Sequence, residues 1–477
     1  MKIASIIGGK ELNDESRETL AVKNPYNDET VAEIVLANEE DLDEAVSNSL
    51  SVFKNTMKMM PAHERARILA KAADLLEQQK EDFAYMIVQE AGKPIKHSRA
   101  EITRSIQILR YASELCKHVT GEVLQMDADL RGSDKMGFVK RVPVGVVAAI
   151  TPFNFPLNLS LHKIAPAIAT GNTVIFKPAE KTPVSAYKLV KLFEEAGLPD
   201  GVINLVLGTG ETVGQALVTH KDIHKITFTG SLTVGKMIRD TAGFKKVTME
   251  LGSNSPNIIF EDADLDQAVE SLVNAAFGFS GQVCVSAQRI YVHEDVYDQF
   301  LGKFVEATKQ LKIGDPRNEE TDIGPMIDEN AAKRAKDWIE EARKQGAAIQ
   351  TGGELDGSIL SPTIITDVEK GMKVVTDEAF APLVSVMPFR TEEEAVERTN
   401  DSIYGLQAGV FTKDIDRAFR VAENLEMGGV WINESCVYRQ DNYPYGGVKQ
   451  SGIGREGVKY AMDEMTEIKF IGVKLSK

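Results

Sequence analysis

Cysteine is scarce in this sequence: the 477 residues include only three, Cys116, Cys284 and Cys436. Such a small, odd number implies no disulfide framework and fits a reducing compartment. The sequence also lacks a run of about 18 uninterrupted apolar residues, which a membrane-spanning helix would need. Its start, MKIASIIGGKELNDESRETL, lacks the apolar region and the cleavage pattern of a signal peptide. We therefore expect a cytoplasmic protein that does not associate with a membrane.

Positive charge is scarce as well, because 71 Asp and Glu residues outnumber 55 Lys and Arg residues and give a net charge of −16. Such a surface repels phosphate backbones, so no nucleic-acid partner is expected. No metal site is expected either. The chain is too long for a single hydrophobic core at roughly 100–200 residues per domain, which predicts two large domains.

Hydrophobic periodicity predicts helices in the first part of the chain and alternating strands and helices after it. Apolar residues fall on one helical face between residues 61 and 90, Gly92 and Pro94 follow as a stop signal, and a second helical pattern covers about Ala100 to Val119. From Val142 onward, short β-branched runs alternate with helix-like segments. The runs are VGVVAAIT, NTVIFKP, INLVLG, KITFTG and KVTMELG.

A second series of the same kind begins at PNIIFED and continues to about Trp431. Strand, helix and strand at this spacing are typical of βαβ units, and therefore of parallel sheets that are buried on both faces. We predict an α/β fold with two open parallel-sheet domains and a boundary near residues 252–256.

Several of the predicted strands end in polar or glycine-rich segments, where open parallel sheets bind ligands. The third strand is followed by GTGETVG, whose glycines precede a helix as in dinucleotide-binding loops. Its spacing departs from the usual G-x-G-x-x-G, so this signal alone is weak. The second strand is followed by Lys177 and Glu180, which could bind the ribose hydroxyls of NAD. A solvated charge pair is the alternative.

Cys284 lies in FGFSGQVCVSAQR, among small and β-branched residues, where a lone cysteine is most often an inert core residue. Other motifs change that interpretation. TPFNFP, KPAEKTP, FTGS, MELGSNSPNIIFEDADLD, GQVCVSAQR, DEAFAPL and YPYGGVKQSGIGREG occur in the order and spacing typical of the aldehyde dehydrogenase superfamily. The chain resembles this superfamily from VKNPYNDE to MTEIK, and its lactaldehyde dehydrogenase-like branch in particular. The resemblance implies that Cys284 is the nucleophile of an NAD-dependent aldehyde oxidation.

The resemblance also implies an architecture. It assigns residues 1–121 and 142–252 to an NAD-binding domain, 253–452 to a catalytic domain, and 122–141 and 453–477 to a small β extension that bridges subunits. Both extension segments contain strand-like patterns, and an exposed strand is a liability unless it is paired. A homodimer or homotetramer is therefore expected.

Four residues carry the implied catalysis. The Cys284 thiolate would attack the aldehyde to form a thiohemiacetal, and loss of hydride would leave a thioester. The side-chain amide of Asn154 and the backbone N–H of Cys284 would stabilise the oxyanion. Glu250, an acid in apolar company, would activate the water that hydrolyses the thioester. Lys177 belongs to this catalytic set as well as to the cofactor site.

The cofactor implied by the resemblance is NAD, with NADP as the weaker alternative because the Glu180 carboxylate would repel a 2′-phosphate. Its expected site combines the strand-end segments with two residues of DEAFAPL. The expected residues are Ile150, Thr151, Pro152, Phe153, Lys177, Glu180, Gly210, Gly214, Phe228, Thr229, Gly230, Ser231, Val234, Leu251, Glu378 and Phe380.

The substrate candidates are Arg439, His162, Arg104 and Phe155. By resemblance, Arg439 lies in the loop that closes the substrate entrance, where a guanidinium could bind a carboxylate, phosphate or sulfonate. Plainer alternatives exist: Arg439 as a solvated charge, His162 in a local hydrogen bond, and Arg104 paired with Glu101. We expect a short aldehyde with a hydroxyl or an anionic group, such as lactaldehyde, glyceraldehyde or a semialdehyde.

Cys116 is expected to pack inside a helix bundle, and Cys436 to line the substrate tunnel rather than act as a second nucleophile. Other functions stay open: a CoA-acylating dehydrogenase, an NADP-dependent non-phosphorylating dehydrogenase of the glyceraldehyde-3-phosphate type, and a catalytically silent structural protein. Glu250 argues against CoA acylation, because enzymes of that kind generally lack the base. Cys284, Asn154 and Glu250 together argue against a silent protein.

Overall fold

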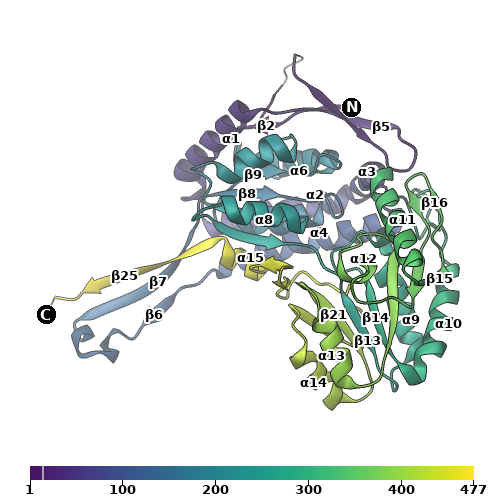
Figure 1. Cartoon of the computed structure of the whole chain (residues 1–477). Helices are drawn as coiled ribbons and strands as arrows, with labels where there is room; N and C mark the ends of the chain where they lie inside the picture. The colour runs from purple at the N-terminus through teal and green to yellow at the C-terminus, as the bar shows by residue number, and fades with distance from the viewer. Residues whose placement is uncertain (13–15, 477) are drawn as a thin grey trace.

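Two helix-covered sheets form the body of the protein, which the computed structural model describes over residues 1–12 and 16–476 (Figure 1). In spatial order, the first sheet consists of β24 (Gly452–Ile453), β12 (Lys246–Glu250), β11 (Lys225–Thr229), β8 (Val146–Ile150), β9 (Thr173–Lys177), β10 (Ile203–Leu205), β2 (Ile6–Ile7) and β3 (Lys10–Glu11). Strands β12 to β10 are parallel, whereas β24, β2 and β3 pair antiparallel. The apolar, β-branched sequences of β8, β9 and β11 suit strands that are buried on both faces.

Helices cover both faces of this sheet. One face packs against α2 (Ala62–Gln78), α3 (Lys80–Ala91), α4 (Ile95–Leu115), α5 (Asn158–Ala169) and α6 (Pro183–Glu195), and the other against α1 (Glu39–Val52), α7 (Gln215–Thr219) and α8 (Leu232–Thr241). The helical pattern predicted over residues 61–90 is therefore two helices, which Gln79 separates. The stop signal after it is confirmed, since Gly92 ends α3 in the left-handed conformation with φ of 66°.

The second sheet is also mostly parallel. In spatial order it consists of β15 (Ala348–Thr351), β18 (Thr363–Thr366), β19 (Leu383–Phe389), β14 (Arg289–His293), β13 (Pro256–Ile259), β21 (Gln407–Phe411) and β22 (Gly429–Ile432). Only β15 pairs antiparallel within it. Its flanking helices include α9 (Leu265–Phe277), α10 (Tyr297–Lys309), α11 (Glu329–Lys344), α13 (Glu392–Asn400) and α14 (Ile415–Asn424).

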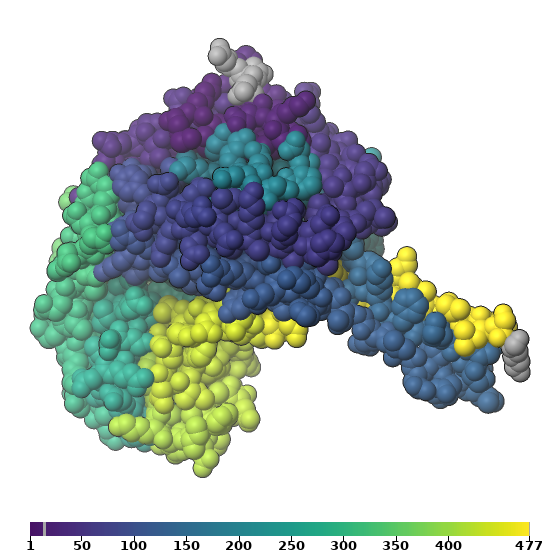
Figure 2. All heavy atoms as spheres, turned by 180° about the vertical axis from the view of Figure 1, so that it is seen from behind, coloured from purple at the N-terminus to yellow at the C-terminus, as the bar shows by residue number. Residues whose placement is uncertain are grey.

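A third, three-stranded sheet projects from the body as an arm (Figures 1 and 2). It consists of β25 (Thr466–Lys474), β7 (Lys135–Pro143) and β6 (Glu122–Leu124), all antiparallel. The chain before β25 belongs to the body, because β24 extends the first sheet and α15 (Val458–Glu464) packs against α4 and α5. The division into domains with the boundaries given above stays a prediction. Within the described ranges, no helix has both the length and the apolar character that crossing a membrane requires.

Candidate active site

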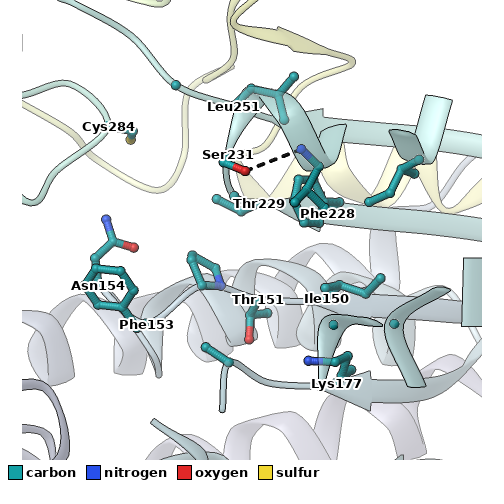
Figure 3. A pocket seen from close by; sticks show the side chains of 18 of the residues that line it. Ile150, Thr151, Phe153, Asn154, Lys177, Phe228, Thr229, Ser231, Leu251 and Cys284 are labelled. Atoms are coloured by element: carbon teal, nitrogen blue, oxygen red, sulfur yellow. Dashed lines mark hydrogen bonds between the residues drawn. The ribbon is translucent and has the colours of Figure 1, made fainter. Parts of the chain in front are cut away.

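A cavity of about 480 Å³ lies at the carboxyl ends of β8, β9, β11 and β12 (Figure 3). Every residue that the sequence assigns to the cofactor site lines it, and so do Asn154 and Cys284. The strand-end rule therefore brings the expected residues together in one place. Six further residues, which the sequence did not assign to the cofactor site, line the cavity, although Ala179 and Gly252 lie within the motifs KPAEKTP and MELG. These are Ala179, Val218, Met237, Ile238, Gly252 and Arg334.

The cavity wall suits a nicotinamide dinucleotide. Lys177 Nζ lies 3.0 Å from Glu180 Oε1, so a charged pair with a half-buried carboxylate is present for ribose hydroxyls. Ser231 caps the N-terminus of α8 by accepting a hydrogen bond from the Val234 N–H, and this positive helix end lines the cavity. At Gly210 even a Cβ atom would meet only Glu180 Oε1, at 3.9 Å, so the glycine leaves room for a ligand.

The loop before Cys284 has an unusual backbone. Phe279, Ser280 and Gly281 follow one another in the left-handed region, with φ values of 50°, 55° and 67°. A Cβ at Gly281 would overlap the carbonyl oxygen of Ala381, so only glycine fits there. Two non-glycine residues in this conformation indicate a loop that the surrounding structure holds in place.

The Cys284 thiol lies where the cavity meets a buried polar cluster. Its Sγ atom lies 3.0 Å from the hydroxyl oxygen of Tyr445. Burial raises the pKa of the thiol to about 11, although the Tyr445 hydrogen bond and the charge of Arg439 act in the opposite direction. Ionisation of Cys284 is therefore opposed by burial and favoured by its neighbours Tyr445 and Arg439.

Asn154 faces the same end of the cavity from the turn that follows β8 (Figure 3). Its Nδ2 atom donates a hydrogen bond of 2.9 Å to the carbonyl of Gln282, two residues before Cys284. This bond fixes the amide relative to the cysteine loop and uses one of its two N–H groups. Its Oδ1 atom is buried and has no partner among the described residues.

Glu250 ends β12, but its buried side chain is not among the residues that line the cavity. Neither of its carboxylate oxygens has a hydrogen-bond partner within the described chain. Burial raises the pKa of Glu250 well above its ordinary value, and the negative charge of Glu456 adds to the effect. A carboxyl group whose pKa is raised in this way holds a proton more readily than an ordinary glutamate, which suits a group that accepts a proton from water.

Comparison with known proteins decides the family. A model of the aldehyde dehydrogenase family matches residues 12–471. The chain belongs to this family. It is 45% identical to 3-sulfolactaldehyde dehydrogenase of Priestia megaterium over 458 aligned residues. The alignment covers 96% of this chain and 95% of that protein.

Lactaldehyde dehydrogenase of Methanocaldococcus jannaschii is 43% identical over 470 residues, which is 98% of this chain and 99% of that protein. The crystal structure of glyceraldehyde-3-phosphate dehydrogenase GapN from the same organism, complexed with NADP, has a TM-score of 0.93 at 42% identity. The structural match covers 96% of this chain and the whole GapN chain. The predicted family, fold class and enzyme class are thus confirmed: this aldehyde dehydrogenase is an oxidoreductase that acts on aldehydes with a nicotinamide cofactor.

This aldehyde dehydrogenase contains a network of buried charges that no sequence motif predicted. Glu456 accepts hydrogen bonds from Lys163, at 2.8 Å, and from Arg439, at 2.7 Å, and all three side chains are at least nine-tenths buried. Lys163 also donates to the hydroxyl of Thr229. Burial opposes the ionisation of Glu456, but the two cations outweigh it and lower its pKa. A lysine in the apolar segment LHKIAP was the one sequence signal that could have indicated this network.

Arg439, one of the substrate candidates, belongs to this network, and His162 and Arg104 lie beside it. Arg439 is not a solvated charge, because its side chain is only 8% exposed and its Nε atom lacks a partner among the described residues. His162 Nε2 lies 2.9 Å from Asp441 Oδ1. Arg104 pairs with the same Asp441 at 2.6 Å, so the suggested pairing with Glu101 is wrong.

The remaining predictions concern Phe155 and two cysteines. The Phe155 ring lies against the ammonium group of Lys93, 3.7 Å from the ring centroid. Cys116 is buried among core residues, and its thiol donates to the backbone carbonyls of Ala62 and Ala169. Cys436 is also fully buried, and its sulfur is held between the side chain of Asn257 and the carbonyl of Val285. The expectation that Cys436 lines an open tunnel is therefore wrong.

Proposed function

We propose that this aldehyde dehydrogenase uses NAD to oxidise a short aldehyde carrying a hydroxyl or an anionic group, with Cys284 as the nucleophile. One observation carries the proposal. The thiol of Cys284 and the amide of Asn154 both line one cavity, and the buried carboxyl group of Glu250, at the end of β12, has no hydrogen-bond partner in the part of the chain that the structure describes.

In the proposed reaction, the Cys284 thiolate attacks the carbonyl carbon and forms a thiohemiacetal. The free N–H of the Asn154 side chain and the backbone N–H of Cys284 donate to the oxyanion, and each such donor typically lowers a barrier by about 3–4 kcal/mol. The nicotinamide ring supplies the hydride acceptor when bound in the cavity. The thioester left on Cys284 is then hydrolysed by a water whose proton Glu250 takes.

The substrate class rests on charge and on the relatives. The cations Lys163 and Arg439 share one hydrogen-bonded carboxylate, that of Glu456. An anionic substituent on the aldehyde would be favoured there. The names of the two relatives at 45% and 43% identity, 3-sulfolactaldehyde and lactaldehyde dehydrogenase, fit this class.

The preference for NAD rests on Glu180. Its carboxylate is paired with Lys177 at the end of β9, where it suits a free 2′-hydroxyl better than a 2′-phosphate. The proposed oligomer, a homodimer or homotetramer, rests on the projecting arm, whose β25 exposes Ile468 by 68% and Phe470 by 52%.

The test is NADH formation by the purified protein with a panel of short aldehydes, with and without CoA. We expect CoA-independent oxidation of hydroxylated and anionic aldehydes, and no oxidation by Cys284→Ala, which should still bind NAD. A requirement for CoA would favour the acylating alternative. Appreciable turnover by a folded Cys284→Ala protein would remove Cys284 from the mechanism.

A further inference from the structure

Tyr445 is placed against the sulfur of Cys284 by a rigid backbone. The backbone N–H of Tyr445 donates to the carbonyl of Glu456 at 3.1 Å, and the Glu456 N–H donates back to Tyr445 at 2.7 Å. The Tyr445 side chain is only 2% exposed. Among the described residues, Tyr445 is the one whose side chain lies within hydrogen-bonding distance of the Cys284 sulfur, at 3.0 Å. This contact joins segments that are 161 residues apart in the chain.

Arg439 lies on the face of the same phenol ring. Its guanidinium carbon is 3.7 Å from the ring centroid of Tyr445, and its Nη2 atom is fixed by Glu456 at 2.7 Å. A cation on an aromatic face withdraws electron density from the ring, which makes the phenolic O–H a better hydrogen-bond donor. The same positive charge favours an anion on the sulfur. Both effects act toward a thiolate at Cys284.

We propose that Tyr445 is a further catalytic residue, whose phenolic O–H donates a hydrogen bond to the Cys284 thiolate and so favours the ionised nucleophile. The inference rests on the proposed role of Cys284. With a neutral thiol either group can donate, whereas a thiolate can only accept, so ionisation of the sulfur fixes the direction of the bond. Burial opposes that ionisation, and hydrogen bonding to the charged form is one of the few ways to favour it.

The test measures ionisation of the thiol without any aldehyde. The rate of Cys284 alkylation by iodoacetamide is followed against pH by mass spectrometry, for the wild type and for Tyr445→Phe. A charge-assisted hydrogen bond predicts that the midpoint of the profile moves upward by about one to two pH units in the variant. Tyr443→Phe is the matched control, because the Tyr443 hydroxyl donates to the Tyr438 carbonyl and not to the sulfur. We expect no shift there.

Kinetics and a second variant complete the test. Tyr445→Phe should lose acylation rate by about tenfold or more at neutral pH and recover it at high pH, which a merely structural role would not produce. Replacement of Tyr445 by 3-fluorotyrosine, a more acidic phenol, should move the alkylation midpoint downward. An unchanged midpoint in Tyr445→Phe, or a downward shift, overturns the inference. If the midpoint depends on Tyr445 but the wild type oxidises no aldehyde, the proposed function fails and the contact stands.

Discussion

The ammonium group of Lys93 lies 2.5 Å from the carboxylate of Glu101, and neither side chain is exposed. The other carboxylate oxygen of Glu101 accepts hydrogen bonds from the backbone N–H groups of Leu157 and Asn158, at 3.0 and 3.1 Å. These groups begin α5, directly after the turn that carries Asn154. The buried ion pair therefore fixes the turn that holds the proposed oxyanion donor.

Removal of the carboxylate should destabilise the protein strongly. Glu101→Ala leaves the buried Lys93 cation without a counter-charge and two backbone N–H groups without an acceptor, which typically costs about 3–5 kcal/mol of unfolding free energy. Equilibrium unfolding in urea measures this change. Glu81→Ala is the control, because Glu81 pairs with Arg99 at the surface with 64% of its side chain exposed, and exposed pairs contribute roughly 0–1 kcal/mol. Equal effects of the two substitutions would contradict the structural role of Glu101.

Glu250→Gln should block the reaction after hydride transfer. The first turnover should give a burst of NADH near one per active site, followed by very slow turnover, because the amide cannot accept a proton from water. Rapid-mixing absorbance measurements separate the two phases. Absence of a burst would assign Glu250 to activation of the thiol instead.

The pH dependence of the wild type should report the same group. Only the deprotonated carboxylate of Glu250 can act as a base, and burial together with Glu456 raises its pKa well above the ordinary glutamate value. Deacylation should therefore be slow below this raised pKa and rise as the pH increases through it. The Glu250→Gln variant should lack this limb of the profile.

Sequence motifs predicted which residues line the cavity because most of these motifs follow the ends of parallel strands, and parallel strands bring their carboxyl ends together. The role of these residues in binding the cofactor stays a prediction. The motifs did not predict the polar cluster behind Cys284. Tyr445, Glu456 and Lys163 meet through contacts between distant segments, and no local periodicity marks such contacts.

Arg104 illustrates the same limit. Helical spacing suggested Glu101 as its partner, yet the carboxylate of Glu101 is on the buried face and is occupied by Lys93, while Arg104 reaches Asp441, 337 residues away. Cys436 was placed at a tunnel wall from the position of its loop. Its side chain instead points into the core beside Asn257. Side-chain direction within an irregular loop depends on packing that the sequence alone does not reveal.

The cofactor preference should depend on Glu180. With the carboxylate present, kcat/KM should be higher with NAD than with NADP, because a 2′-phosphate would meet like charge and lose the ribose hydrogen bonds. Lys177 is paired with Glu180 and offsets only part of this repulsion. Glu180→Ser should narrow the gap, and steady-state kinetics with both cofactors measure it. A wild-type preference for NADP would refute the assignment.

The substrate class can be tested by substituting Arg439 and comparing two aldehydes of different charge. Succinate semialdehyde is anionic and propanal is neutral. If the guanidinium binds the anionic group, Arg439→Ala should lower kcat/KM more for succinate semialdehyde than for propanal. The difference, expressed as activation free energy, should be about 2–5 kcal/mol.

The ratio of kcat/KM for the two aldehydes is the informative quantity. Arg439 also lies on the Tyr445 ring, so its loss should lower the ionised fraction of Cys284 whichever aldehyde is used. That common effect cancels in the ratio. Arg104→Gln provides a comparison, since Arg104 is bound to Asp441 and is 28% exposed. An unchanged ratio in Arg439→Ala would remove Arg439 from the substrate site. A wild-type preference for long apolar aldehydes would overturn the substrate class itself, because Arg439 would then have no anionic group to bind.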